Sequence, residues 1–276
     1  MTRPFISFLT DFGADGAAAI CRGVMLSIAP DAQILDISHS VRKFAIGEGA
    51  YLLWTALPWM PIGVHVAVVD PGVGTDRRPI GIRAVRGDIL IGPDNGLLTA
   101  ATDRLGGIDE VRLLANPGWL LPQQSATFHG RDIFAPMAAH LALGGDFGEV
   151  GPIVDAGSIV DVRFPRPAIR DGGLETVAIY VDSFGNIRLA ATPEDLARAL
   201  GEIAPGTGVR IRFDDAASGE PIASTATFAR TFGSLPLGAA LLYMDSSGQL
   251  ALGHNQASAA AALGVEAGRS VRIERA

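Results

Sequence analysis

The segment from His65 to Arg78, HVAVVDPGVGTDRR, decides how the first part of the chain folds. Its run from Val66 to Val69 is apolar and rich in β-branched residues, which is typical of a strand buried on both faces of a parallel sheet. The run ends at Asp70, because the Pro-Gly pair that follows stops a strand and turns the chain. A carboxylate at the end of a buried strand needs partners, and Arg77 and Arg78 are close in sequence. Two interpretations are open: an active-site loop, or a plain Asp-Pro-Gly turn with an arginine counter-ion.

Strands and helices alternate around this segment. We expect strands at Phe5–Leu9 and Ile34–Ile37, separated by a helix at Ala17–Ala29 and followed by a helix at Ile46–Leu57. With the strand that leads into Asp70, this β-α-β-α-β order predicts an α/β domain with a mainly parallel central sheet. Later in the same domain we expect further strands at Ile80–Val85, Asp88–Ile91 and Val111–Leu114, and helices at Leu97–Leu105 and Ile133–Leu143.

The amino-acid composition changes between Gly151 and Gly173, where prolines and glycines are frequent. We therefore divide the chain into an α/β domain at residues 1–167 and a second domain at residues 168–276. Short alternating segments with Gly-rich turns predict that the second domain is a smaller, all-β, barrel-like domain interrupted by one helix. Its strands are expected at Thr176–Val181, Asn186–Ala190, Val209–Phe213, Leu241–Met244, Leu250–Leu252 and Val271–Ile273, and its helix at Pro193–Leu200.

The composition narrows the class of partner and the cellular compartment. A net charge of −7, with Lys43 as the only lysine, argues against nucleic acid as a partner. The sequence contains neither a recognisable signal peptide nor an apolar stretch of roughly 18 residues, so we expect a cytoplasmic protein without membrane contact. The single cysteine, Cys21, lies in an apolar helical pattern and is expected to be buried rather than nucleophilic.

Three carboxylates, Asp11, Asp70 and Asp94, each follow a short apolar run at a Gly-containing turn. If their strands are parallel neighbours, these residues lie along one edge of the sheet. His129 adds an imidazole at a loop-to-helix junction, and Asp132 nearby could cap the first amides of the helix.

Several known chemistries lack their sequence signatures here. No Gly-x-Ser-x-Gly elbow, P-loop or dinucleotide fingerprint is present. A metal-dependent hydrolase is a weaker alternative, because the five histidines are dispersed along the chain.

Taken in order, the motifs FLTDFG, HVAVVDPGVGTDRR, GPDNGLL, TFHGRDIFAPMAAHLA and DSFGN resemble those of the S-adenosyl-L-methionine (SAM) hydrolases. These enzymes are also called SAM hydroxide adenosyltransferases and are relatives of fluorinase and chlorinase. The resemblance covers residues 5 to 273, and several motifs in a fixed order are more specific than any one of them.

The resemblance implies hydrolysis of SAM to adenosine and L-methionine, by attack of an activated water on C5′. It also implies a homotrimer with SAM bound where two subunits meet. The implied reaction requires neither a metal nor a cofactor. The family's catalytic Asp, Arg and His match Asp70, Arg77 and His129. The halogenating relatives lack that Asp and His, and fluorinase carries an inserted loop for which the segment from Ile82 to Leu90 leaves no room. Hydrolysis is therefore favoured over halide transfer.

The same resemblance assigns substrate contacts in both domains. Asp11 matches a ribose-binding carboxylate, and Asp182 and Asn186 match residues that contact the methionine amine and the adenine. Ser247 stands where fluorinase carries an arginine for the methionine carboxylate, so that contact has to be made differently here. The remaining expected substrate contacts are Phe44, Phe184, Ser246 and Asn255.

Two alternatives to hydrolysis stay open at this stage. A SAM-dependent halide transferase would form 5′-chloro-5′-deoxyadenosine in high chloride. A non-catalytic sensor of SAM or adenosine would bind its ligand without consuming it.

Overall fold

The computed structural model describes residues 3–214 and 221–276. The chain forms two compact units, of which the first ends at Arg163 and the second begins at Phe164. This division lies within the stretch where the composition of the sequence changes.

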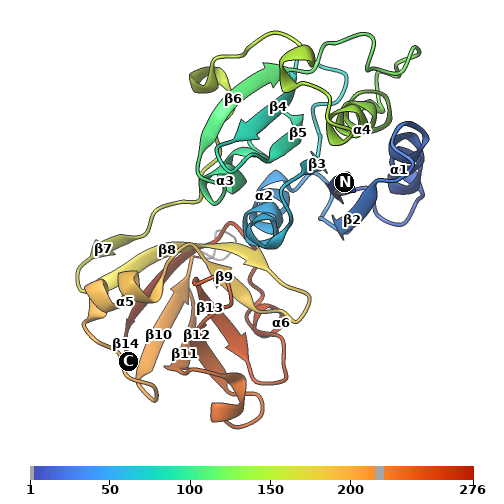
Figure 1. The fold of residues 1–276 in the computed structure, drawn as a ribbon. Helices are drawn as coiled ribbons and strands as arrows, with labels where there is room; N and C mark the ends of the chain where they lie inside the picture. Colours follow the sequence, from blue (N-terminus) through green and yellow to red (C-terminus); the bar gives the residue numbers. More distant parts are fainter. Residues whose placement is uncertain (1–2, 215–220) are drawn as a thin grey trace. The chain divides into compact units, whose positions relative to one another are not determined.

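The first unit is built on a six-stranded sheet with the order β2-β1-β3-β5-β4-β6 (Figure 1). Strands β2, β1, β3 and β5 are parallel, whereas β4 is antiparallel to both β5 and β6. The mainly parallel sheet predicted from the sequence is confirmed, with the β4–β5 hairpin adding the antiparallel part. The strand bounds are β1 Phe5–Thr10, β2 Gln33–Ser38, β3 Val64–Val68, β4 Pro79–Ala84, β5 Ile89–Pro93 and β6 Ile108–Leu113.

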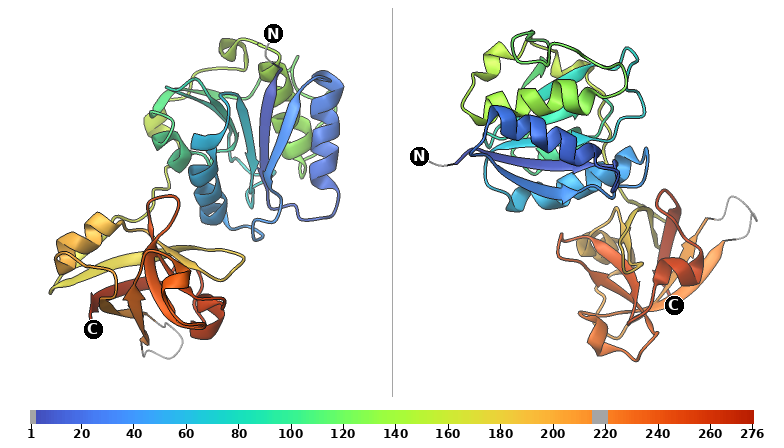
Figure 2. Two further views of the ribbon diagram at one scale, coloured as in Figure 1. Left: turned by 60° about the horizontal axis from the view of Figure 1, so that its bottom comes forward. Right: turned by 90° about the vertical axis from the view of Figure 1, so that its right-hand side faces the viewer.

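Helices cover both faces of this sheet. On one face, α1 (Ala17–Ile28) and α4 (Ala135–Ala142) pack against Phe8, while on the other α2 (Ile46–Ala56) and α3 (Thr99–Asp103) pack on the side that carries Leu9. Figure 2 shows α1 and α4 lying side by side. Because side chains alternate along a strand, covering both faces requires an unbroken apolar run, which is the pattern seen before Asp70. No helix among residues 3–214 and 221–276 has the length and apolar character that a bilayer span requires.

The predicted helix Ile133–Leu143 begins differently from the expectation. Residues Gly130–Phe134 form one π-helical turn, and α4 follows it. The Asp132 carboxylate does not cap helix amides, so that prediction is wrong. It accepts hydrogen bonds from the amide of Ser125, at 2.7 Å, and from the Arg131 guanidinium, and so fixes the preceding loop to the π turn.

The second unit is a closed seven-stranded barrel with the order β14-β10-β11-β12-β13-β9-β8, closed by the pairing of β14 with β8. The barrel-like domain predicted from the sequence is confirmed, with β7 as an extra edge strand. Apolar side chains such as Ile211, Leu242 and Leu252 fill its core. The strands are β7 Ala168–Arg170, β8 Gly173–Val181, β9 Ile187–Leu189, β10 Gly208–Phe213, β11 Ile222–Phe228, β12 Ala240–Met244, β13 Leu250–His254 and β14 Ser270–Arg275, and the helices are α5 Pro193–Leu200 and α6 Ala259–Leu263.

The sequence analysis missed β7, β11 and α6. Strand β11 has the sequence IASTATF, in which hydroxyl-bearing and small residues hide the apolar alternation of a strand. Helix α5 matches its predicted bounds, because Thr192 and Asp195 form a capping box and Pro193 opens the first turn.

A chain of buried polar groups crosses the first sheet. The Ser7 hydroxyl lies 2.8 Å from Nδ1 of His65, and Nε2 of His65 lies 2.9 Å from the Asp88 carboxylate. Arg86 also donates to Asp88, and it reaches the carbonyl of Leu57 beyond α2. These Ser, His and Asp side chains resemble a hydrolase triad in composition only, because all three are buried inside the sheet and their role is structural.

We predict that Asp88→Ala lowers the free energy of unfolding by about 3 kcal/mol, measured by urea denaturation, because it leaves Arg86 and buried His65 without their shared carboxylate. Burial raises the pKa of the Asp88 carboxyl, but the hydrogen bonds and charges of Arg86 and His65 outweigh it and hold this pKa well below its usual range. Its contribution is therefore present above the unfolded-state pKa near 4 and declines as the pH falls below that value.

The matched control is Asp109→Ala. Asp109 is 50% exposed and also pairs with an arginine, Arg83. A surface pair of this kind contributes less than about 1 kcal/mol. Equal losses in the two variants would contradict a special role for the buried chain.

Candidate functional site

The carboxyl ends of β1 and β3 form the floor of a hollow in the first unit. Asp11 follows β1 and Asp70 follows β3, and because these strands are parallel neighbours both carboxylates reach the same edge. The hollow has a volume of about 480 Å³. Its lining residues are Asp11, Phe12, Lys43, Phe44, Val68, Asp70, Val73, Thr127, Phe128, His129 and Gly130.

Asp70, Arg77 and His129, the three predicted catalytic residues, are joined by hydrogen bonds. Arg77 donates through Nε to Oδ1 of Asp70 at 3.1 Å and through Nη2 to Oδ2 of the same carboxylate. The same Nη2 lies 3.0 Å from Nδ1 of His129. The side chains of Asp70 and Arg77 are only 5% and 7% exposed, so the ion pair is buried. A paired arrangement of this kind offsets the cost of burying both charges.

The hydrogen bond from Arg77 determines which nitrogen of His129 carries a proton. A guanidinium can only donate, so Nδ1 accepts and a neutral imidazole carries its hydrogen on Nε2. Burial, followed by the positive charge of Arg77, lowers the pKa of His129, while Asp70 and Asp132 oppose this shift. His129 is therefore held neutral near pH 7.

Nη1 of Arg77 is buried and has no hydrogen-bond partner among the described residues. A buried N–H without a partner is costly, so this donor is a candidate to bind a substrate atom or a water. It belongs to the same guanidinium that bonds Asp70 and His129.

Two loops approach each other closely to form the cluster. Gly74 has φ +79°, and a Cβ there would lie 2.5 Å from the carbonyl oxygen of Ala126. Only glycine fits this position, and it brings the loop that carries Arg77 against the loop that carries His129.

Asp11 and Phe44 are in direct contact at the same edge. The amide of Phe44 donates to Oδ2 of Asp11 at 2.9 Å, and Phe44 adopts φ +66°, a conformation that is unfavourable for an aromatic residue. The ring is 69% exposed. The structure thus places both expected substrate contacts at the hollow, and their assigned roles stay predictions.

Asp94 is the third carboxylate predicted at this edge, but it does not line the hollow. Its oxygens accept from Arg78 at 2.8 Å and from the amide of Val160 at 2.8 Å. Of the two arginines proposed as partners of Asp70, only Arg77 has that role. Arg78 instead joins Asp94 to the segment around Ser158.

The expected contacts in the second unit are grouped around Arg188. Asp182 accepts from the amide and side chain of Asn186, and also from Arg188 at 3.0 Å. Arg188 also donates to Asp245, next to Ser246, at 3.0 Å. The turn after β8 and the turn after β12 are therefore tied together.

The other expected contacts of this unit differ in exposure. Phe184 is 79% exposed and Ser246 is exposed, whereas Asn255 is buried and donates to the carbonyl of Leu235 at 2.8 Å. The roles assigned to these residues from the resemblance stay predictions.

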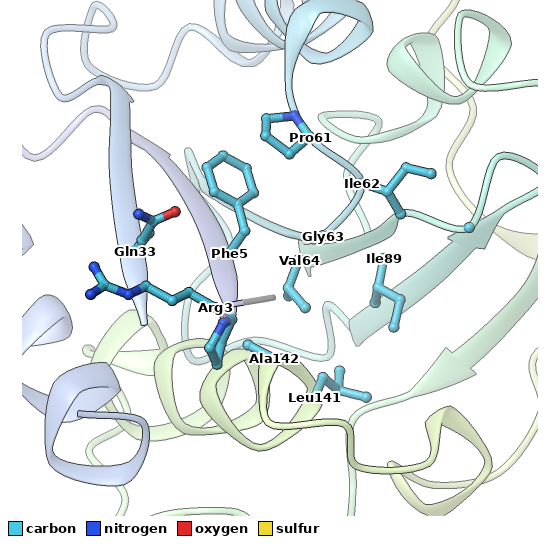
Figure 3. A pocket seen from close by; sticks show the side chains of 12 residues that line it. Arg3, Phe5, Gln33, Pro61, Ile62, Gly63, Val64, Ile89, Leu141 and Ala142 are labelled. Carbon is cyan, nitrogen blue, oxygen red and sulfur yellow. The ribbon is translucent and has the colours of Figure 1, made fainter. Parts of the chain in front are cut away.

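A larger hollow of about 690 Å³ lies at the opposite edge of the first sheet (Figure 3). Phe5, Val64 and Ile89 form its apolar wall, and Arg3 is the one charged residue among its lining residues. This lining offers no carboxylate or imidazole, so the smaller hollow is the better candidate for an active site.

Neither a cluster of candidate metal ligands nor a thiol with a lowered pKa occurs in the described part of the chain. It contains no group of three or more His, Cys, Asp or Glu side chains placed to hold a metal ion. Burial raises the pKa of the Cys21 thiol to about 12, which makes it a poor nucleophile.

The sequence analysis did not identify Phe12, Lys43, Val73, Thr127 and Phe128 as lining residues. Thr127 and Phe128 precede His129 in the TFHGRD motif, which is the signal that could have found them. Lys43 was noted only because it is the single lysine of the chain.

The fold and the cluster together define a two-domain α/β and β-barrel protein with an enzyme-like site at the carboxyl edge of its sheet. The chain belongs to the SAM hydroxide adenosyltransferase family. Residues 6–151 match the model of the N-terminal domain of that family, and residues 177–272 match the model of its C-terminal domain.

Curated relatives include two groups of enzymes. The chain is 43% identical to the (R)-S-adenosyl-L-methionine hydrolase of Salinispora arenicola, over 99% of this chain and 98% of the relative. It is 37% identical to the enzyme of the same name from Thermus thermophilus, over 98% and 99%. A fluorinase of an Actinoplanes species is 30% identical, over 99% and 98%.

A solved structure confirms the architecture. The crystal structure of an uncharacterized conserved protein from Thermotoga maritima matches with a TM-score of 0.88 and 31% identity, over 98% of this chain and all of that one. The predicted family membership is therefore confirmed.

We predict that His129 titrates with a midpoint below the ordinary value near 6.5, and that Arg77→Met raises this midpoint by removing a nearby positive charge. The measurement is a pH titration of the imidazole signals by NMR. His140 is the internal control, because its pKa is lowered by burial and not by Arg77. A wild-type midpoint at or above 6.5 would contradict the electrostatic account.

Proposed function

We propose that this protein hydrolyses SAM to adenosine and L-methionine. The observation that carries the proposal is the hydrogen-bonded cluster of Asp70, Arg77 and His129, with its ion pair buried, beside a hollow that also contains Asp11. The 43% identity to a named SAM hydrolase supports it.

The reaction makes particular demands on the protein. Attack by water forms the C5′–O bond while the C5′–S bond breaks, and the electron pair of that bond passes to sulfur. Because the sulfonium becomes a neutral thioether, methionine leaves without an acid. Water must lose one proton, so the protein has to hold water in line with C5′ and stabilise its developing hydroxide character.

The cluster meets these demands with two donors and one carboxylate. Nη1 of Arg77 and the Nε2–H of neutral His129 can donate to the water oxygen, which favours hydroxide. We assign the proton to Asp70, because it is the only carboxylate of the cluster and both cluster partners are donors toward the water. Arg77 holds that carboxylate in place through hydrogen bonds to both of its oxygens.

We further propose that the preferred substrate is the (R) epimer at the sulfonium centre. The support is the printed name of the Salinispora and Thermus relatives, which specifies that epimer. The two epimers place the methionine chain differently, whereas the water is held in line with C5′ for both. We therefore expect the epimers to differ more in KM than in kcat.

We propose that the active form is a homotrimer with SAM bound between the first domain of one subunit and the second domain of the next. The exposed rings of Phe44 and Phe184 support this, because both would be covered by such a site. We predict a mass about three times 28.7 kDa in light scattering. A monomer that turns over SAM at the same rate would contradict the shared site.

We propose that neither a metal nor a cofactor takes part in the reaction, since none of the steps above requires one. The formal charge of −7 suits a cationic substrate and does not favour nucleic acid as a partner. A cytoplasmic location stays a prediction.

The deciding experiment is chromatography of the purified protein incubated with each SAM epimer in chelator-containing, halide-free buffer. We predict that adenosine and methionine form in equal amounts. Asp70→Ala should lower turnover at least about 100-fold while the protein still binds SAM, because the proton acceptor is lost but most substrate contacts remain.

Each of the other possible outcomes would indicate a different function or mechanism. Bound but intact SAM would indicate a sensor, and 5′-chloro-5′-deoxyadenosine in high chloride would indicate a halide transferase. Loss of activity with chelator would indicate a metal-dependent hydrolase. Unchanged turnover in Asp70→Ala would remove Asp70 from the mechanism.

A further inference from the structure

Lys43, the only lysine of the chain, lines the hollow that contains Asp11 and Asp70. Its side chain is exposed, and no hydrogen bond or ion pair joins its ammonium to another described residue. Nζ lies 3.7 Å from the position that a Cβ would take at Gly13, so the ammonium lies over the turn that follows β1.

The backbone on both sides of Lys43 is held by carboxylates. The amide of Arg42 donates to Glu48 at 3.2 Å, and the amide of Phe44 donates to Asp11 at 2.9 Å. The opposing turn is held as well, since the amide of Gly13 donates to the carbonyl of His39 at 2.7 Å. A cation that has no partner among residues 3–214 and 221–276 therefore extends from a segment held by hydrogen bonds.

The charged groups of the hollow suit different parts of the proposed substrate. Asp11 suits a hydroxyl group, and Asp70 with its partners suits the water that attacks C5′. An ammonium repels both the sulfonium and the amine of SAM, so the group of the substrate that it attracts is the carboxylate. Arg77 is not assigned this role, because its Nε and Nη2 bond Asp70 and His129 and its Nη1 is proposed to hold the attacking water.

We propose that Lys43 binds the carboxylate of the amino-acid end of the substrate and so determines specificity for SAM over analogues without that group. The proposal rests on the proposed function for the identity of the substrate. A charge-assisted hydrogen bond from a flexible lysine would anchor the methionine chain while the hollow holds the ribose.

The test compares two ligands that differ only in the carboxylate. The first is S-adenosyl-L-homocysteine, whose neutral sulfur is not a leaving group under these conditions, and the second is its decarboxylated derivative. Dissociation constants measured by calorimetry do not depend on turnover, so this experiment can succeed even if hydrolysis fails.

We predict that Lys43→Met weakens binding of S-adenosyl-L-homocysteine about tenfold and binding of the decarboxylated derivative less than about twofold. Lys43→Arg should restore most of the preference for the carboxylate. Arg3→Met is the matched control, because it removes a cation from the other hollow of the same unit, and it should leave both constants unchanged.

Equal weakening of both ligands, or none, would overturn the proposal. So would a change in oligomeric mass in Lys43→Met, because the ammonium would then contact another subunit. If Lys43→Met selectively weakens binding of the ligand with the carboxylate but the wild type does not cleave SAM, the proposed function fails and the assignment of Lys43 stands.

Discussion

The carboxylate of Asp70 is buried at the end of a strand, and Arg77 is the group that makes this burial possible. Without it, an ionised carboxylate in this position would cost several kcal/mol. The pair requires the loop after β3 to return toward the sheet, and Gly74 allows that loop to press against the loop of His129. The geometry of the cluster depends on this interaction, and so does the position of the Arg77 donor that has no partner among the described residues. His129 is kept neutral first by burial and then by the charge of Arg77, against the effect of Asp70.

Access to the hollow separates functional from structural polar groups in this molecule. Asp94 and Asp88 are also buried carboxylates with arginine partners, but their remaining contacts are to protein groups. Asp11, Asp70 and His129 instead line a hollow and leave polar capacity for a ligand. A hydrogen-bond partner is therefore common to all of them, and access to the hollow identifies the candidate site.

The two units hold their polar groups together in different ways. In the first unit, residues from four separate segments are brought together by the shared edge of β1 and β3 and by two loops. In the second unit, Arg188 ties two turns of the barrel and positions Asp182 beside Asn186. Both arrangements are held together by hydrogen bonds between side chains, which suits a reaction that relies on alignment of water with C5′.

The sequence by itself determined the mainly parallel sheet, the barrel and the family, because apolar periodicity and ordered motifs are local properties of the chain. It also placed Asp11, Asp70 and Asp94 along one edge, since parallel strands end together. It did not reveal which arginine meets Asp70, that Asp94 is structural, or that Asp132 holds a loop instead of capping a helix. Strand β11 was missed for a related reason, since its polar residues fit a strand only when neighbours pair with it. The tertiary structure decided these points because each depends on side chains that are distant in sequence, and only the packing of strands and loops sets which of them meet.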